Sequence, residues 1–496
     1  MREPPKTIWN IAANVTGIVV NMISGLLVMP YLIQTLGNTT YGLWILIGTL
    51  TGYFGVLDLG VSAAVGRLVA IHHARREPGQ INDVLSTALV LLLVVAAAIC
   101  VATVAALPLF PRLFTVPPAN ALDVRHSLLL VGANLALTFP ASIFSGLLWG
   151  FARFDLQNAV DVPALILRTV LTLTLVTASA PLRTLAVIVL VVTVSSALCK
   201  MLLCYRLLPG LRISLAHVRR GRVREILSIG GWLNVILWSR TLIPQIAPTL
   251  IGARLGSASV TTFTVGRQLV VYANIFAQHA TQVMTPGATG AYATNAVAAQ
   301  RELFIEGGKY AYALTIFLSA GLFLLGLPFI HWWQHGLQDA AFVPLVVLML
   351  GESLPMSQWL TYSVLLGAGR QRALGLLALS EAALLVPLIL VLITRGGVTG
   401  VCIGVAIAAF WARGLAQWLY GCRLLRVSLG AYGREVFIPV TLAAAGPVAA
   451  LYVAVLTLAP HSFAAIFAVG IAYTLLYAAT LAWTLLGYAR LKAMLS

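Results

Sequence analysis

Four arginines lie inside apolar stretches long enough to cross a membrane: Arg168, Arg240, Arg267 and Arg413. An arginine at the centre of a bilayer helix costs roughly 2.5–3.5 kcal/mol on a lenient insertion scale, so four would cost on the order of 10 kcal/mol. That sum is comparable to the whole stability of a typical fold. Because such residues persist where they face water or an anionic partner, they predict a polar, cationic route through the membrane.

Two of the apolar spans carry a polar stripe. Arg267 shares one helix face with Asn274 and Gln278, and a membrane helix that is amphipathic in this way borders water or polar protein. The first span carries a similar stripe of asparagines, namely Asn10, Asn14 and Asn21. Two interpretations of that stripe remain open: the wall of a polar cavity, or hydrogen bonding and close packing between helices.

Two of the other three arginines, Arg168 and Arg413, have structural alternatives to a binding role. Arg168 stands two turns after Asp161, so the two could form an intramembrane ion pair that fixes helix register. Arg413 lies nearer the cytoplasmic half of its span and could snorkel to the surface. Arg240 is close to Pro244, a residue that permits a bend. All four arginines are candidate substrate ligands.

Three acidic residues also lie within the spans: Asp58, Glu352 and Glu381. An intramembrane carboxylate can carry a proton, or bind sodium when it is ionised, so these are candidates for ion coupling. Asp58 could instead cap a helix that restarts after a glycine break. Glu352 and Glu381 could instead pair with a mid-span arginine, and the sequence does not decide between these roles.

The composition is that of a membrane protein that crosses the bilayer many times. Of the 496 residues, 60% are hydrophobic and 9% are charged, whereas a soluble domain carries about 25% charged residues. The net charge of +17 fits the topology of the loops and contact with anionic phospholipids. The five cysteines fall in expected helices without metal-ligand spacing, so no metal site is expected.

Fourteen apolar runs qualify as spans. They cover residues 8–33, 41–72, 82–110, 122–150, 157–179, 184–207, 225–252, 258–285, 308–333, 341–366, 373–394, 398–422, 435–458 and 463–488. Most lysines and arginines then lie at the ends that would be inside if both termini are cytoplasmic. No loop has room for a soluble catalytic domain, so a transporter is favoured over an enzyme.

A repeated sequence indicates two lobes. The pattern Leu-x-Gly-x-small-Arg ends the fourth span at Arg153 and the tenth at Arg370, and Gly37 and Gly256 follow the first and seventh spans. The prediction is an all-α protein of two six-helix lobes plus two C-terminal helices. The expected divisions are an N-terminal lobe, a basic cytoplasmic linker, a C-terminal lobe and two additional helices, at residues 1–207, 208–224, 225–426 and 427–496.

The region from 8 to 75 resembles the Wzx and polysaccharide-transport branch of the MATE-like flippase superfamily. The resemblance rests on Tyr-Gly-Leu-Trp from Tyr41, on Gly-Val-Leu-Asp-Leu-Gly-Val-Ser from Gly55, and on Gly66-Arg67. It implies a MATE-like fold with V-shaped lobes around a cationic lumen, and alternating access. The implied location is the bacterial inner membrane.

The resemblance also implies a substrate, an undecaprenyl-pyrophosphate-linked oligosaccharide such as an O-antigen repeat unit, moved from the cytoplasmic to the periplasmic leaflet. Arginines in such flippases serve the pyrophosphate, a role that would fall to Arg267, Arg240 and Arg168. Guanidinium groups suit this task because they bind phosphate oxygens in a bidentate manner. A polysaccharide polymerase and chain-length machinery are expected partners; no cofactor and no nucleic acid is expected.

Three alternatives come from other classes. A MATE-type drug or cation antiporter would favour acids over arginines in its lumen. A lipid II flippase would share the fold. A membrane glycosyltransferase or O-antigen polymerase would need a long periplasmic loop bearing catalytic acids, and the sequence has no such loop.

Overall fold

The computed structural model describes residues 6–495 except 59, 229–230 and 283–296, and gives the backbone alone for 6–15, 228, 231, 233, 282, 297, 299 and 485–495. The side chains of Asn10 and Asn14 therefore lie outside the described part. Within that part every regular element is a helix, which confirms the all-α prediction. The chain forms two compact units, 1–261 and 262–496.

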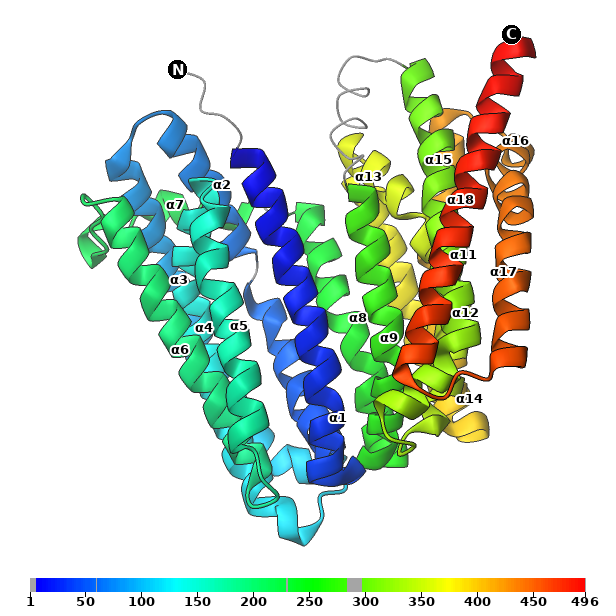
Figure 1. Ribbon diagram of the computed structural model, residues 1–496. Helices are drawn as coiled ribbons and strands as arrows, with labels where there is room; N and C mark the ends of the chain where they lie inside the picture. Colours follow the sequence, from blue (N-terminus) through cyan, green and yellow to red (C-terminus); the bar gives the residue numbers. More distant parts are fainter. Residues whose placement is uncertain (1–5, 59, 229–230, 283–296, 496) are drawn as a thin grey trace. The chain divides into compact units, whose positions relative to one another are not determined.

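The first unit contains eight α-helices and the start of a ninth (Figure 1). Their bounds are α1 Lys6–Phe54, α2 Val61–Ala74, α3 Pro78–Leu113, α4 Ala121–Gly150, α5 Phe154–Leu175, α6 Pro181–Leu207, α7 Arg220–Ser228, α8 Gly231–Leu255 and α9 Ser257–Gln282. Short 3-10 turns lie at η1 Gly55–Asp58, η2 Pro118–Asn120 and η3 Leu215–His217.

The second unit contains the rest of α9 and the remaining helices. Their bounds are α11 Val297–Trp333, α12 Phe342–Ser357, α13 Trp359–Gly367, α14 Gln371–Ala409, α15 Gln417–Leu425, α16 Leu429–Tyr432, α17 Ile438–Leu458 and α18 Phe463–Leu495. A 3-10 turn, η4, covers Asp339–Ala341, and two π-helical segments cover Phe410–Ala416 (η5) and Gly433–Phe437 (η6).

Two of the apolar helical segments are each long enough for two membrane spans, because a glycine interrupts each of them. In the described residues ten segments are long and apolar enough to cross a membrane, and two of them, Thr16–Asp58 and Gln371–Leu425, are 43 and 55 residues long. Each is broken by a glycine outside the helical region, Gly37 (φ 74°) or Gly397 (φ 53°), so each provides two spans. With α8 and α9, which are not among the ten, this recovers the fourteen expected spans.

The predicted internal repeat is matched by two identical helix ends. In α4 and in α13 the N–H of the arginine that follows the helix, Arg153 or Arg370, donates to a leucine carbonyl five residues earlier at 2.9 Å. The residue before each arginine, Ala152 (φ 53°) or Gly369 (φ 69°), is left-handed. Both ends are therefore Schellman motifs, which satisfy the last carbonyls of a helix.

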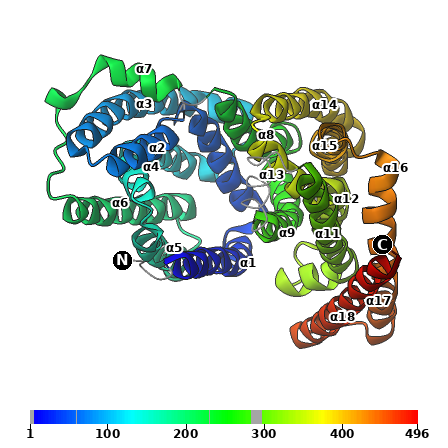
Figure 2. The same cartoon turned by 90° about the horizontal axis from the view of Figure 1, so that it is seen from above.

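The core of the first unit lies where α2, α3 and α4 pack side by side (Figure 2). Glycines let α4 approach α2 closely: a Cβ on Gly150 would lie 2.5 Å from Cγ1 of Val69 and 2.9 Å from the carbonyl of Gly66. Helices in lipid associate through such small residues because burial of apolar surface provides no driving force there. This contact fixes the positions of the polar side chains on α2 and α4.

The predicted basic linker is held against α3. Asn82 donates to the carbonyl of Gly210 at 3.1 Å and accepts from the N–H of Arg212 at 3.1 Å. Ser86 and Thr87 accept from backbone N–H groups further along the same segment, at 3.2 and 3.1 Å. Side chains of one helix thus satisfy the backbone of a segment that has little regular structure of its own.

The last two helices pack on α11 in the second unit (Figure 2). The hydroxyl of Tyr477 donates to the carbonyl of Ala313 at 2.7 Å, and that of Tyr473 donates to Phe317 at 3.3 Å. Tyr473 also stacks on the ring of Phe317, with centroids 5.1 Å apart. Two buried hydroxyls therefore specify how α18 lies along α11, where apolar contacts alone would permit sliding.

Gly150→Ala should destabilise the first unit by about 1–3 kcal/mol, because its methyl group would overlap α2 backbone and Val69. Gly48→Ala is the matched control, since a Cβ at Gly48 meets nothing within 4 Å. Thermal unfolding in detergent, followed by tryptophan fluorescence, measures both. Equal midpoints for the two variants would show that the α2–α4 contact tolerates a larger residue.

Candidate functional site

The most highly connected polar group of the second unit is Arg413, at the centre of the π-helical segment η5. Its Nε donates to both carboxylate oxygens of Glu381 on α14, each at 3.0 Å. Its Nη1 and Nη2 donate to the two oxygens of Glu352 on α12, at 2.9 and 2.5 Å. One guanidinium therefore binds two acids from two helices, in the fork geometry that makes such pairs strong. We call these three residues the Arg413 triad.

Close helix packing and the wide π turn bring the triad together. A Cβ on Gly351, beside Glu352, would lie 2.4 Å from Cα of Ala406 on α14, and a Cβ on Gly414 would lie 3.1 Å from Leu354 on α12. These glycines allow α12, α14 and η5 to approach. A π turn adds one residue to a helix and commonly occurs where a side chain has a special task. Here it contains the arginine.

Asn274 extends the triad to α9 and α13. Its Nδ2 donates to Glu352 at 3.0 Å, and its Oδ1 accepts from the indole N–H of Trp359 at 2.9 Å. Glu352 and Trp359 lie on opposite sides of the break that separates α12 from α13. At that break the carbonyl of Gln358 accepts from Nε2 of Gln417 at 2.8 Å. The interruption of the helix is thus satisfied by hydrogen bonds from two neighbouring helices.

Arg267 stands two turns before Asn274 on α9 and is half-buried. Its neighbour Gly266 packs tightly, since a Cβ there would lie 2.3 Å from the carbonyl of Ala341 at the start of α12. The negative charge that acts on Arg267 is that of Glu352. Within the described residues, however, its guanidinium makes neither a hydrogen bond nor an ion pair. Its five N–H donors are therefore not used by any described residue.

The acid of the first unit has hydroxyl partners. Asp58 is half-buried and accepts from the hydroxyl of Ser62 at 2.8 Å and from its N–H at 3.4 Å. The Ser62 hydroxyl also lies 2.8 Å from that of Ser142 on α4. Asp58 thus contacts the first turn of α2, whose N-cap residue is Gly60. No cation pairs with this carboxylate in the part of the chain that the structure describes.

Asp161 pairs with a residue that sequence reasoning passed over. Nζ of Lys200 on α6 lies 2.8 Å from Oδ1 of Asp161 on α5 and donates to Ser145 of α4 at 3.1 Å. Asp161 therefore does not form the alternative pair with Arg168, which is exposed and has no partner among the described residues. The available signal was a lone lysine inside the apolar run 184–207.

The remaining candidates are partly or fully exposed. Asn21 and Arg240 are exposed on α1 and α8, and Gln278 is half-buried on α9. The polar residues around Arg240 pack against the glycine-rich end of α1: a Cβ on Gly52 would lie 2.7 Å from Gln245. Of the predicted residues, the structure joins four, namely Asn274, Glu352, Glu381 and Arg413, by direct hydrogen bonds.

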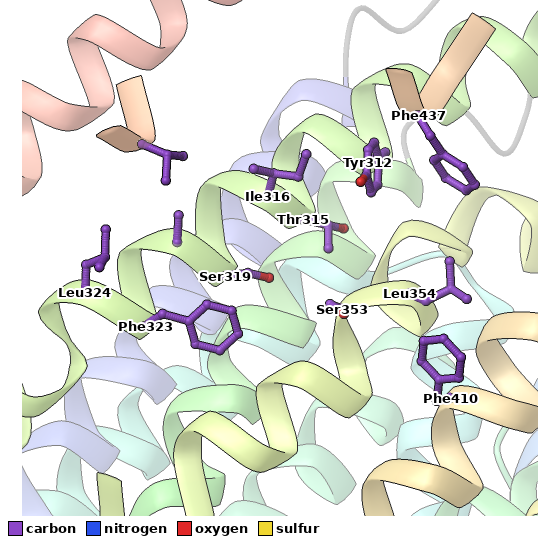
Figure 3. Close-up of a pocket in the computed structure, with 12 residues that line it drawn as sticks. Tyr312, Thr315, Ile316, Ser319, Phe323, Leu324, Ser353, Leu354, Phe410 and Phe437 are labelled. Atoms are coloured by element: carbon purple, nitrogen blue, oxygen red, sulfur yellow. The ribbon is translucent and has the colours of Figure 1, made fainter. Parts of the chain in front are cut away.

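A cavity of about 560 Å³ lies in the second unit among α11, α12, η5 and α17 (Figure 3). Phe323 and Leu324 of α11, Leu354 of α12 and Phe410 of η5 line it, with Ser319 and Ser353 among the few polar groups. Its lining suits hydrocarbon better than a charged or sugar group. It is therefore distinct in chemistry from the Arg413 triad, although α12 and η5 contribute to both.

Comparison with known proteins identifies relatives in polysaccharide biosynthesis. The family model described as "Polysaccharide biosynthesis protein" matches residues 8–288, more than half of the chain. A membrane protein of Bacillus subtilis (strain 168) named EpsK and described as uncharacterized is 23% identical over 233 residues. That match covers 46% of this chain and 45% of EpsK, so the chain spans less than half the length of this relative.

Solved structures of transporters share the fold. An inward-facing multidrug resistance MATE family transporter of the MOP superfamily superposes with a TM-score of 0.67 at 16% identity, covering 83% of this chain and 94% of its own. A MOP superfamily transporter from Pyrococcus furiosus gives a TM-score of 0.61 at 16% identity, covering 84% and 94%. The predicted MATE-like fold is confirmed. Together with the apolar helices, these similarities identify a multi-pass membrane protein.

Arg413→Gln should destabilise the second unit by about 3–5 kcal/mol, because it leaves two buried carboxylates without their cation. Adding Glu352→Gln and Glu381→Gln to that variant should restore part of the loss, since the uncompensated charges are removed. Thermal unfolding in detergent measures the series, with Arg168→Gln as a control for removal of an exposed arginine. A triple variant less stable than Arg413→Gln alone would contradict the charge argument.

Proposed function

The chain belongs to the polysaccharide biosynthesis protein family, and on that premise we propose that it is a flippase for an undecaprenyl-pyrophosphate-linked oligosaccharide. Family and fold are those of membrane transporters. The proposed direction is from the cytoplasmic to the periplasmic leaflet of a bacterial inner membrane, with both termini cytoplasmic. The cargo would be a repeat unit of O-antigen or of another polysaccharide.

The observation that supports this proposal most is Arg267. A guanidinium on a helix of a membrane protein is costly unless something compensates its charge. Within the described residues it has no hydrogen-bonding partner, whereas Arg413 has two acids. A pyrophosphate group supplies the missing acceptors, because its oxygens match the guanidinium fork. Arg240 and Arg168, both exposed in the first unit, are the next candidates for phosphate contact.

The mechanism proposed is alternating access, with the headgroup in a polar site and the polyprenyl tail in the bilayer. Among the acids, Asp58 is the strongest candidate for proton or sodium coupling, because Glu352 and Glu381 are bound to Arg413. Anionic phospholipids at the basic loops are proposed lipid partners, and a polysaccharide polymerase with its chain-length machinery is the proposed protein partner.

An export function for drugs or cations is the second candidate, because multidrug MATE transporters share the fold. A carboxylate such as Asp58, which has no cation partner among the described residues, is the kind of group that such a pump requires. The two functions predict different effects when the protein is deleted from cells. Loss of a flippase retains an oligosaccharide on the cytoplasmic side, whereas loss of an exporter raises sensitivity to cationic compounds.

Arg267→Ala should lower translocation of the lipid-linked oligosaccharide at least about tenfold, because a charged hydrogen bond to phosphate is lost. The measurement is the fraction of undecaprenyl-linked sugar that a membrane-impermeant glycosidase reaches in spheroplasts, at matched expression. Arg267→Lys should retain part of the activity, since it keeps the charge without the fork.

Arg395→Ala serves as the control, because Arg395 is exposed beside the Gly397 break. Unchanged sidedness in the Arg267 variants would remove this residue from the substrate path. Unchanged sidedness after deletion of the whole protein would overturn the flippase proposal and favour the exporter.

A further inference from the structure

The two acids of the Arg413 triad are not equivalent. Glu381 is bound by Nε of Arg413 alone, and its side chain is 5% exposed. Glu352 takes both terminal nitrogens of Arg413 and the amide of Asn274, and its side chain is 14% exposed. Glu352 is thus the acid that connects the Arg413–Glu381 pair to α9, the helix that carries Arg267.

The charges around Glu352 balance only when both arginines are counted. Arg413 with its two acids leaves one excess negative charge, and Glu352 is bound by Asn274, which lies two turns after Arg267 on α9. Two guanidinium groups and two carboxylates then sum to zero. A low-dielectric surrounding strongly favours such balance, because isolated charges there are poorly compensated.

An anion that binds Arg267 disturbs this balance. It brings its own negative charge to α9, the helix that binds Glu352 through Asn274, and like charges repel in a low-dielectric surrounding. Its oxygens can also replace a carboxylate at Arg413, because phosphate and carboxylate use the same bidentate geometry. The Arg413 side chain is 35% exposed, so its guanidinium is not sealed from an incoming group.

We infer that Glu352 is an internal counter-ion that the anionic headgroup must displace, so that it sets the affinity and charge selectivity of the site. This inference rests on the proposed function for the identity of the headgroup as a pyrophosphate. Glu352 acts through Arg413, Arg267 and Asn274 and is a positioning residue. A multiply charged pyrophosphate overcomes its competition more easily than a single-charged ion does, so Glu352 excludes small monoanions.

Displacement of Glu352 also changes the helix break between α12 and α13. Asn274 links Glu352 before the break to Trp359 after it. When the carboxylate leaves Asn274, that link is lost, while the hydrogen bond from Gln417 to the carbonyl of Gln358 stays. Arrival of the headgroup is thereby communicated from α9 to the segment that follows the break.

The test uses the full-length protein in nanodiscs of phosphatidylcholine, with inorganic pyrophosphate as the probe and calorimetry as the readout. Glu352→Gln should bind pyrophosphate at least about fivefold more tightly than wild type, because one competing charge is removed. Glu381→Gln is the matched control: it removes the same charge from the same arginine, but Glu352 is the acid that accepts a hydrogen bond from α9, through Asn274. It should change the affinity less than about twofold.

Two further measurements separate a competing counter-ion from a merely structural residue. Chloride should compete with pyrophosphate more effectively in Glu352→Gln than in wild type, because exclusion of monoanions is lost. Arg267→Gln should abolish binding in either background. If Glu352→Gln unfolds, Glu352→Asp replaces it: the shorter side chain keeps the charge but reaches Arg413 less well, so its affinity should lie between the two.

The inference is overturned if Glu352→Gln leaves the affinity unchanged or weakens it, if Glu381→Gln tightens binding equally, or if the wild-type protein does not bind pyrophosphate. Its failure is distinct from failure of the flippase proposal. If pyrophosphate binding responds to Glu352 but the protein translocates no oligosaccharide in cells, the flippase proposal is rejected and the counter-ion inference stands. If the protein translocates oligosaccharide but its pyrophosphate binding does not respond to Glu352, the counter-ion inference is rejected and the flippase proposal stands.

Discussion

Neutralising a guanidinium among apolar helices is the constraint on which the second unit depends. Arg413 meets it with two acids, and each acid comes from a different helix. The helices can supply them only by close approach, which Gly351 and Gly414 permit. The π-helical segment, which adds one residue to the helix, contains Arg413 itself. The two acids, the two glycines and the π-helical segment therefore all serve to compensate the charge of Arg413.

The positively charged side chains within the spans differ in how many acidic partners balance their charge. Arg413 is fully paired and so contributes chiefly to the architecture of its own unit. Lys200 has a single acid and a hydroxyl, which connect α4, α5 and α6. Among the described residues Arg267 has no hydrogen-bonding partner, and the charge of Glu352 acts on it without a direct ion pair. A mid-span arginine without a hydrogen-bonded partner is the kind of residue that a transporter reserves for its cargo.

Sequence reasoning located the helices because an apolar run of sufficient length has few alternatives in a membrane. It also placed interruptions between residues 33 and 41 and between residues 394 and 398, where Gly37 and Gly397 leave the helical region. It did not identify partners. Arg413 binds acids 61 and 32 residues away in sequence, and Asp161 pairs with Lys200 in place of Arg168. Such choices depend on which helix faces touch, and no local pattern encodes that.

The two Schellman ends bear on the history of the chain. One uses glycine at its left-handed position and the other uses Ala152, for which that conformation costs roughly 1 kcal/mol. If the repeat arose by duplication, one copy has lost the residue that favoured this turn while the turn itself persists. The left-handed backbone conformation is then retained even where glycine, the residue that adopts it at least cost, is absent.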